Sequence, residues 1–189
     1  MIQVRLAAPR RAARVTGLIL WAALLRAFVI PAGDVLSTIV FAGCLLAITW
    51  VERPSLTTES GWGRARALCA GLVVGAILLA PVMTEPLSSR PLGAFLPWAA
   101  LAALVATLEE TSIRGVLYTH LAREAGTVTA IVVGAAVFAL IHLPRYGLGA
   151  MPLDAAVGLA LGGLRALTGR VLPCAVAHTV ADWGAWFWA

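Results

Sequence analysis

The chain has 189 residues, of which 61% are hydrophobic and only 12% are charged, and its mean hydropathy is +0.92. Soluble domains carry about 25% charged residues, so this composition excludes an ordinary soluble fold and predicts a protein embedded in a lipid bilayer. The net charge of +5 comes entirely from arginines, which are scattered between apolar stretches instead of gathered on one nucleic-acid-binding face. We therefore expect the lipid bilayer, and no nucleic acid, as a partner.

Seven apolar stretches follow one another along the chain, separated by residues that favour turns. Most are about long enough to cross a hydrocarbon core of about 30 Å as helices. The sequence therefore predicts an all-α, polytopic transmembrane helix bundle of about seven membrane helices, within a range of six to eight. We expect one membrane-embedded domain over residues 1–189, with helices at about 15–30, 34–51, 67–83, 95–124, 127–143, 152–168 and 171–188.

The positions of the arginines predict how the helices are oriented in the membrane. Basic residues precede the first stretch, which favours a cytoplasmic N-terminus. With seven crossings the C-terminus lies outside, and the turns near these residues also lie inside: Arg53, Arg64, Arg66, Arg123, Arg165 and Arg170. The alanine-rich and arginine-rich composition suggests a bacterial protein, so the predicted location is the plasma membrane of a bacterium.

Two pairs of glycines predict close packing between helices. Gly71 with Gly75, and Gly158 with Gly162, have the spacing of small residues that allows helix backbones to approach each other in lipid. Arg26 and Asp154 also stand out in this apolar chain, and we interpret them as snorkelling or capping groups near the ends of helices.

Two adjacent carboxylates lie in the middle of the long fourth stretch. Ionisable groups inside a membrane are costly, so they indicate a partner or a function. Glu110 and Arg114 are four residues apart and share a helix face, whereas Glu109 is rotated by about 100° and need not share that partner. An unpaired carboxylate suits a general base, although the spacing does not fix which glutamate takes that role.

Two histidines on later stretches are candidates to join these acids. Counted at the helical rise from the turn at Gly126, both the glutamates and His142 lie about 24 Å along neighbouring helices. His178 and Asp182 are one helical turn apart on the last stretch, about 12 and 18 Å from the turn at Gly169 by the same rise. Three helices are therefore expected to contribute polar groups to one composite site.

These motifs, in their order along the chain, resemble those of the CAAX protease and bacteriocin-processing family, also called CPBP or Abi, which includes type II CAAX prenyl endopeptidases. The resemblance covers about residues 98–182 and rests on Glu-Glu-x-x-x-Arg at 109–114, Phe-x-x-x-His at 138–142 and His-x-x-x-Asp at 178–182. It implies an intramembrane endopeptidase with a catalytic core at about 95–188. The implied substrate is a membrane-associated peptide or protein.

The resemblance also implies roles for individual residues. Glu109 and His142 would activate a water molecule, Glu110 and Arg114 would support them, and His178 with residue 182 would stabilise the oxyanion. Many family members carry asparagine where this chain has Asp182, and an ionised aspartate cannot donate a hydrogen bond to an oxyanion. Asp182 could instead orient His178.

The same residue types leave the question of metal open. Two histidines and a carboxylate also form a common catalytic zinc site, whose ligands here would be Glu109, His142 and His178. We expect water activation without a metal or any organic cofactor, and keep zinc as the alternative.

Three other interpretations of the polar cluster compete with catalysis. It could be a structural set of ion pairs that fixes helix packing. It could serve recognition in a non-enzymatic, peptide-binding immunity protein. It could also form the proton relay of a small proton-coupled transporter, although the sequence shows no inverted repeat that would favour one.

Overall fold

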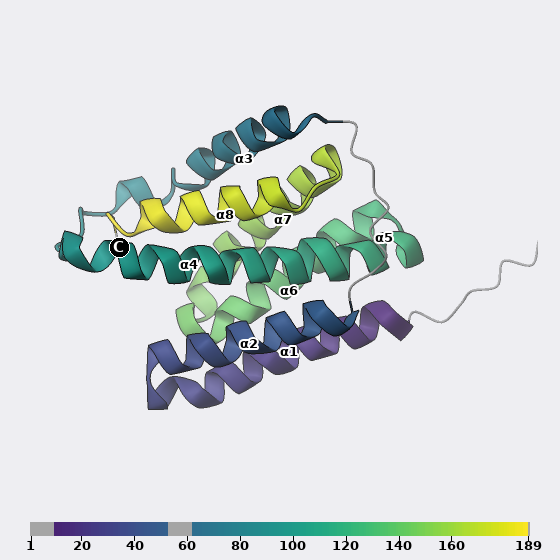
Figure 1. Ribbon diagram of the computed structural model, residues 1–189, viewed down its shortest axis with the longest axis horizontal. Helices are drawn as coiled ribbons and strands as arrows, with labels where there is room; N and C mark the ends of the chain where they lie inside the picture. Colours follow the sequence, from purple (N-terminus) through teal and green to yellow (C-terminus); the bar gives the residue numbers. More distant parts are fainter. Residues whose placement is uncertain (1–9, 53–61, 189) are drawn as a thin grey trace, which may run out of the picture.

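The computed structural model describes residues 10–52 and 62–188, which are helical over most of their length and contain no strand. The helices are α1 (Arg10–Val29), α2 (Asp34–Glu52), α3 (Arg64–Leu78), α4 (Phe95–Glu110), α5 (Tyr118–Ala125), α6 (Thr127–Tyr146), α7 (Met151–Thr168) and α8 (Leu172–Ala185), as Figure 1 shows. A π-helical segment, Thr111–Leu117, joins α4 directly to α5, so these three form one long helix. The all-α prediction is confirmed.

Six helical stretches of the described chain are long and apolar enough to cross a membrane. They include every helix except α8, whose 14 residues extend over only about 21 Å at the helical rise. Large apolar side chains on the outer surface, such as Phe28, Leu96 and Val128, are exposed by 84%, 76% and 74%. Such a surface suits contact with lipid, and the chain is a multi-pass membrane protein. Its described residues form seven principal helices, of which α8 is the shortest.

The helices form packed pairs around the long central helix. In Figure 1, α1 and α2 form a hairpin on one side of α4, and α3 with α8 lies on the other side. Helices α6 and α7 pack against each other behind α4, and α6 also contacts α1. Three sequence-distant helices, α4, α6 and α8, thereby face a shared interior.

Glycines make two of these helix pairs unusually close. A Cβ atom at Gly71 on α3 would lie 2.6 Å from the carbonyl oxygen of Pro173 on α8. One at Gly158 on α7 would lie 2.7 Å from the Cα atom of Ala135 on α6. Neither distance is compatible with a side chain, so the predicted role of the glycine pairs in close packing is confirmed for Gly71 with Gly75 and for Gly158 with Gly162.

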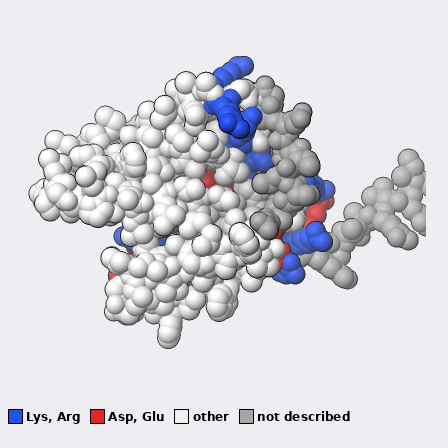
Figure 2. Space-filling view, in the orientation of Figure 1, with Lys and Arg blue, Asp and Glu red and all other residues white. Residues whose placement is uncertain are grey.

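Most arginines of the described chain gather at one end of the bundle, where α1, α3 and α8 begin and α2 and α5 end. Figure 2 shows basic side chains at this end of a largely uncharged face. Arg14 and Glu52 form an ion pair of 2.6 Å, and Arg170 Nε donates to the carbonyl oxygen of Trp62 at 3.4 Å. The arginine-bearing segments that were predicted to lie on one side of the membrane are therefore found together at one end of the bundle. Arg53 lies outside the described residues.

Candidate active site

The two predicted glutamates lie where α4 changes into the π-helical segment. Glu109 and Glu110 are the last residues of α4, and Arg114 belongs to the π-helical segment. All three are buried, with exposures of 3%, 0% and 1%. π-helical turns change the direction in which successive side chains point and are frequent at functional sites. Here the change in helix geometry coincides with the acidic pair.

Glu110 is held on both sides by hydrogen bonds. Its Oε1 atom accepts one from Arg114 Nη1 at 3.0 Å and another from His178 Nδ1 at 3.1 Å. The predicted pairing of Glu110 with Arg114 is thus confirmed. Arg114 is itself fixed, because its Nη2 donates to the carbonyl oxygen of Gly158 at 3.1 Å and its guanidinium lies 4.6 Å from the ring centre of Phe138.

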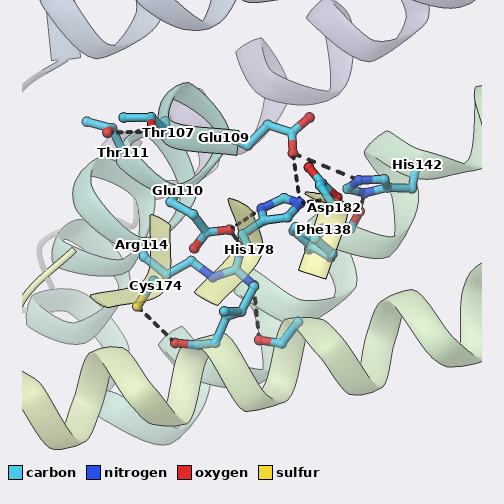
Figure 3. A network of polar contacts seen from close by, with 12 residues as sticks. Thr107, Glu109, Glu110, Thr111, Arg114, Phe138, His142, Cys174, His178 and Asp182 are labelled. Carbon is cyan, nitrogen blue, oxygen red and sulfur yellow. Dashed lines mark hydrogen bonds and ion pairs between the residues drawn. The ribbon is translucent and has the colours of Figure 1, made fainter. Parts of the chain in front are cut away.

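Glu109 faces two imidazole rings, as Figure 3 shows. Its Oε2 atom lies 3.8 Å from Nε2 of His142 and 3.8 Å from Nε2 of His178. The hairpin of the long helix and α6 therefore does bring an acid and an imidazole to the same depth. His178, for which the helical rise gave a looser match, joins them from α8.

In each histidine, a hydrogen bond at Nδ1, the nitrogen farther from Glu109, sets the orientation of the ring. His142 Nδ1 donates to the carbonyl oxygen of Phe138 at 2.7 Å, and His178 Nδ1 donates to Glu110. A histidine that donates from Nδ1 has an unprotonated Nε2 when it is neutral and a protonated Nε2 when it is an imidazolium. Both rings therefore turn Nε2 toward Glu109.

Asp182 lies beside Nε2 of His178. Its Oδ1 atom is 3.8 Å from His178 Nε2, and its side chain is 37% exposed. The hydrogen bond that fixes the His178 ring comes from Glu110, whereas Asp182 stands next to the nitrogen that faces Glu109. A substrate group bound at this nitrogen would also be close to Asp182.

The space between Glu109 and the two histidines suits a small oxygen ligand or a metal ion. Gaps of 3.8 Å are too long for direct hydrogen bonds, yet a water molecule can bridge gaps of this size. One atom each from Glu109, His142 and His178 lies within 4.8 Å of the others. Two histidines and one glutamate also match a catalytic zinc site, so the donor set fits both alternatives.

Sequence reasoning placed one further charged residue wrongly. Arg26 is 5% exposed and lies inside the bundle with its guanidinium 4.8 Å from the ring centre of Phe41, so it does not snorkel. Asp154, by contrast, lies in the first turn of α7, near a helix end as predicted, and one of its carboxylate oxygens is buried. Because charges inside an apolar stretch are rare, the interruption at Arg26 was the signal that could have revealed its placement.

A comparison with family models gives one match, over residues 91–184, to the family described as type II CAAX prenyl endopeptidase Rce1-like. The matched segment begins just before α4, extends nearly to the end of α8 and contains all six candidate site residues. Searches of curated proteins and of solved structures give no match.

Proposed function

We propose that this protein, which belongs to the Rce1-like family of type II CAAX prenyl endopeptidases, hydrolyses a peptide bond near the C-terminus of a membrane-associated peptide or protein. At the level of the family it is an intramembrane CAAX-type protease. The observation that carries the proposal is the convergence of two Nε2 atoms on Oε2 of Glu109 in a buried site.

In the proposed reaction, a water molecule sits between Glu109 and His142. Glu109 accepts one proton from this water as its oxygen attacks the carbonyl carbon of the substrate. The carbonyl oxygen becomes an oxyanion in the tetrahedral intermediate. When the C–N bond breaks, the proton held by Glu109 passes to the leaving nitrogen, which departs as an amine, and the new acid end is formed.

His178 stabilises the oxyanion in this proposal. In its imidazolium form it donates from Nδ1 to Glu110 and can donate from Nε2 to the developing negative charge. Glu110 and Arg114 fix the ring in this orientation, since Arg114 is anchored to Gly158 on α7. Asp182 lies close enough to influence the same nitrogen.

Zinc is the alternative for the same three groups. Glu109, His142 and His178 would hold the ion, which would supply Lewis-acid activation of water and of the carbonyl group. We prefer the mechanism without metal, and a chelator distinguishes the two.

We also propose that the arginine-rich end of the bundle faces the cytoplasm of a bacterium, following the positive-inside rule. His142 is four residues before the end of α6, and α6 ends at the end of the bundle opposite the arginine-rich one. In this orientation, the substrate tail reaches the site from the outer half of the membrane.

The test is cleavage of a farnesylated peptide that ends in Cys-Val-Ile-Ala, by the full chain purified in lipid. We expect Glu109→Gln and His142→Ala each to lower kcat/KM by about 10²-fold to 10⁴-fold, the usual contribution of a positioned acid–base group. Glu85→Gln is the matched control, because Glu85 is exposed and lies in the turn after α3.

A chelator should leave the rate of the wild-type protein unchanged if no metal takes part. Loss of activity with chelator, restored by zinc, would instead favour the metal mechanism. Full activity in both folded variants would contradict the proposed site, whereas peptide binding without cleavage by the wild-type protein would favour a binding protein.

A further inference from the structure

Three rings follow one another along one face of α6. Phe138, His142 and Tyr146 are spaced four residues apart, so they share this face of the helix. The ring centres of Phe138 and His142 lie 4.3 Å apart. Those of His142 and Tyr146 lie 5.8 Å apart, with an angle of 14° between the planes. The His142 ring therefore has one aromatic neighbour on the turn before it and another on the turn after it.

The two aromatic neighbours of His142 differ in their exposure. Phe138 is 2% exposed, and its ring centre also lies 5.3 Å from that of His178, so it closes the site from below. Tyr146 is 57% exposed, although it stacks on a histidine that is only 8% exposed. The site is therefore closed on the side of Phe138 and accessible on the side of Tyr146.

The backbone fixes Tyr146 at this accessible side. Tyr146 is the last residue of α6, and the N–H of Gly147 donates to the carbonyl oxygen of Leu143. Gly147 has a φ of 75°, a conformation that favours glycine and ends the helix at this point. The guanidinium of Arg145 lies 5.8 Å from the centre of the Tyr146 ring. With these contacts made, more than half of Tyr146 is still exposed and available to a ligand.

A substrate that reaches the proposed water molecule comes close to this ring. The water lies between Glu109 and His142, and Tyr146 is one helical turn, about 6 Å, further along α6. An extended peptide advances about 3.3–3.6 Å per residue, so a side chain next to the scissile bond is within reach of the ring. The proposed entry of the tail from the end of α6 puts the residues that follow the scissile bond on this side.

We propose that the ring of Tyr146 contacts the side chain of the residue that follows the scissile bond and makes cleavage depend on the size of that side chain. This inference deepens the proposed function and rests on it. The contact is apolar, because burial of a side chain against the ring removes both surfaces from water, and the hydroxyl group is not needed for it. A Tyr146 that only held the His142 ring in place would act equally on every substrate.

The experiment compares two farnesylated peptides, Cys-Val-Ile-Ala and Cys-Ala-Ile-Ala, which differ only in the side chain after the scissile bond. We expect the wild-type protein to cleave the valine peptide with a kcat/KM about tenfold above that of the alanine peptide, since small differences in apolar size give discrimination of this order. Tyr146→Ala should bring the ratio close to one. Tyr146→Phe, which keeps the ring, should keep the ratio.

Leu148→Ala is the matched control. Leu148 is 75% exposed in the turn after α6, so its truncation removes a neighbouring apolar side chain and should keep the ratio. Thermal unfolding checks that each variant is folded. An equal loss of activity on both peptides in Tyr146→Ala, with the ratio unchanged, would overturn the inference and leave Tyr146 as a support for His142. Equal cleavage of both peptides by the wild-type protein would overturn it as well.

Binding of the released tripeptides, measured by calorimetry with the full chain in lipid, separates this inference from the proposed function. Val-Ile-Ala should bind the wild-type protein about tenfold more tightly than Ala-Ile-Ala, and Tyr146→Ala should remove the difference. A difference that depends on Tyr146, without cleavage of either farnesylated peptide, would refute the proposed hydrolysis and leave the contact standing. Cleavage by the wild-type protein with no preference between the two peptides would do the reverse.

Discussion

At the scale of single residues, the two adjacent glutamates are the same residue type but have different hydrogen-bond partners. Glu110 accepts hydrogen bonds from Arg114 and His178, whereas Glu109 has only the 3.8 Å approaches to the two Nε2 atoms. A carboxylate with two hydrogen-bond donors is held in place, and one without them is available to accept a proton. This difference assigns support to Glu110 and the proposed base role to Glu109.

Asp182 allows a test of oxyanion stabilisation with a single isosteric change. We expect Asp182→Asn to keep the cleavage rate within a few-fold of the wild type or to raise it, because an amide can donate a hydrogen bond beside His178 Nε2. The rate on the farnesylated peptide is the measurement, with Asp34→Asn as the control on an exposed aspartate. Complete loss of cleavage in Asp182→Asn would show that the ionised carboxylate is required.

Sequence analysis could predict which residues meet at the site, but not their hydrogen bonds. The spacing of Glu110 and Arg114 on one helix fixed their contact, because residues four apart share a face. The contact between His178 and Glu110 depends on the relative heights of α8 and α4, which no local pattern reveals. Arg26 was misplaced for the same reason, since its burial results from the packing of α1 against α2 and α6.

At the scale of elements, the π-helical segment connects the site to α7. Arg165 on α7 donates from Nε to the carbonyl oxygen of Arg114 at 3.0 Å, while Arg114 donates to the carbonyl oxygen of Gly158, also on α7. The sequence predicted an uninterrupted helix over 95–124, and it could not show the π-helical turn, whose stabilising partners come from a distant helix. Similarly, α8 ends at Ala185, before its predicted end at 188.

Gly158 therefore couples helix packing to the position of Arg114. We expect Gly158→Ala to lower the melting temperature and the cleavage rate together, because the new Cβ atom would lie 2.7 Å from the backbone of Ala135 and would displace α7. The expected loss of stability is about 1–3 kcal/mol, as for other overpacked sites. Thermal unfolding and the peptide assay measure the two effects.

Gly163, on the same helix, gives the matched control. A Cβ atom there meets no other heavy atom within 4 Å, so Gly163→Ala should leave both quantities unchanged. Equal behaviour of the two variants would contradict the proposed coupling between α7 and the site.

At the scale of the whole molecule, the uneven distribution of arginine distinguishes the two ends of the bundle. Arg14, Arg170 and their partners gather at one end, while Asp34 and Arg145 lie at the other. Composition and hydropathy were sufficient to predict the helix bundle, because lipid requires backbone groups to be satisfied within helices. The predicted single domain over 1–189 stays a prediction, as does the orientation.

Reporter fusions test the orientation directly. We expect green fluorescent protein at the N-terminus to be fluorescent in bacterial cells and alkaline phosphatase after the C-terminus to be active. This follows from seven crossings with the arginine-rich end inside. Fluorescence of a C-terminal fusion would show instead that α8 does not complete a crossing or that the bundle is inverted.

The most direct test of the central claim compares Glu109→Gln with Glu110→Gln in the same cleavage assay, with products identified by mass spectrometry. A glutamine at position 110 keeps an oxygen that can accept from Arg114 and His178, so we expect a loss in kcat of less than about 10²-fold. A glutamine at position 109 cannot take the proton from water, so we expect a loss of about 10³-fold or more. A larger loss in Glu110→Gln than in Glu109→Gln would contradict the account and move the base to Glu110.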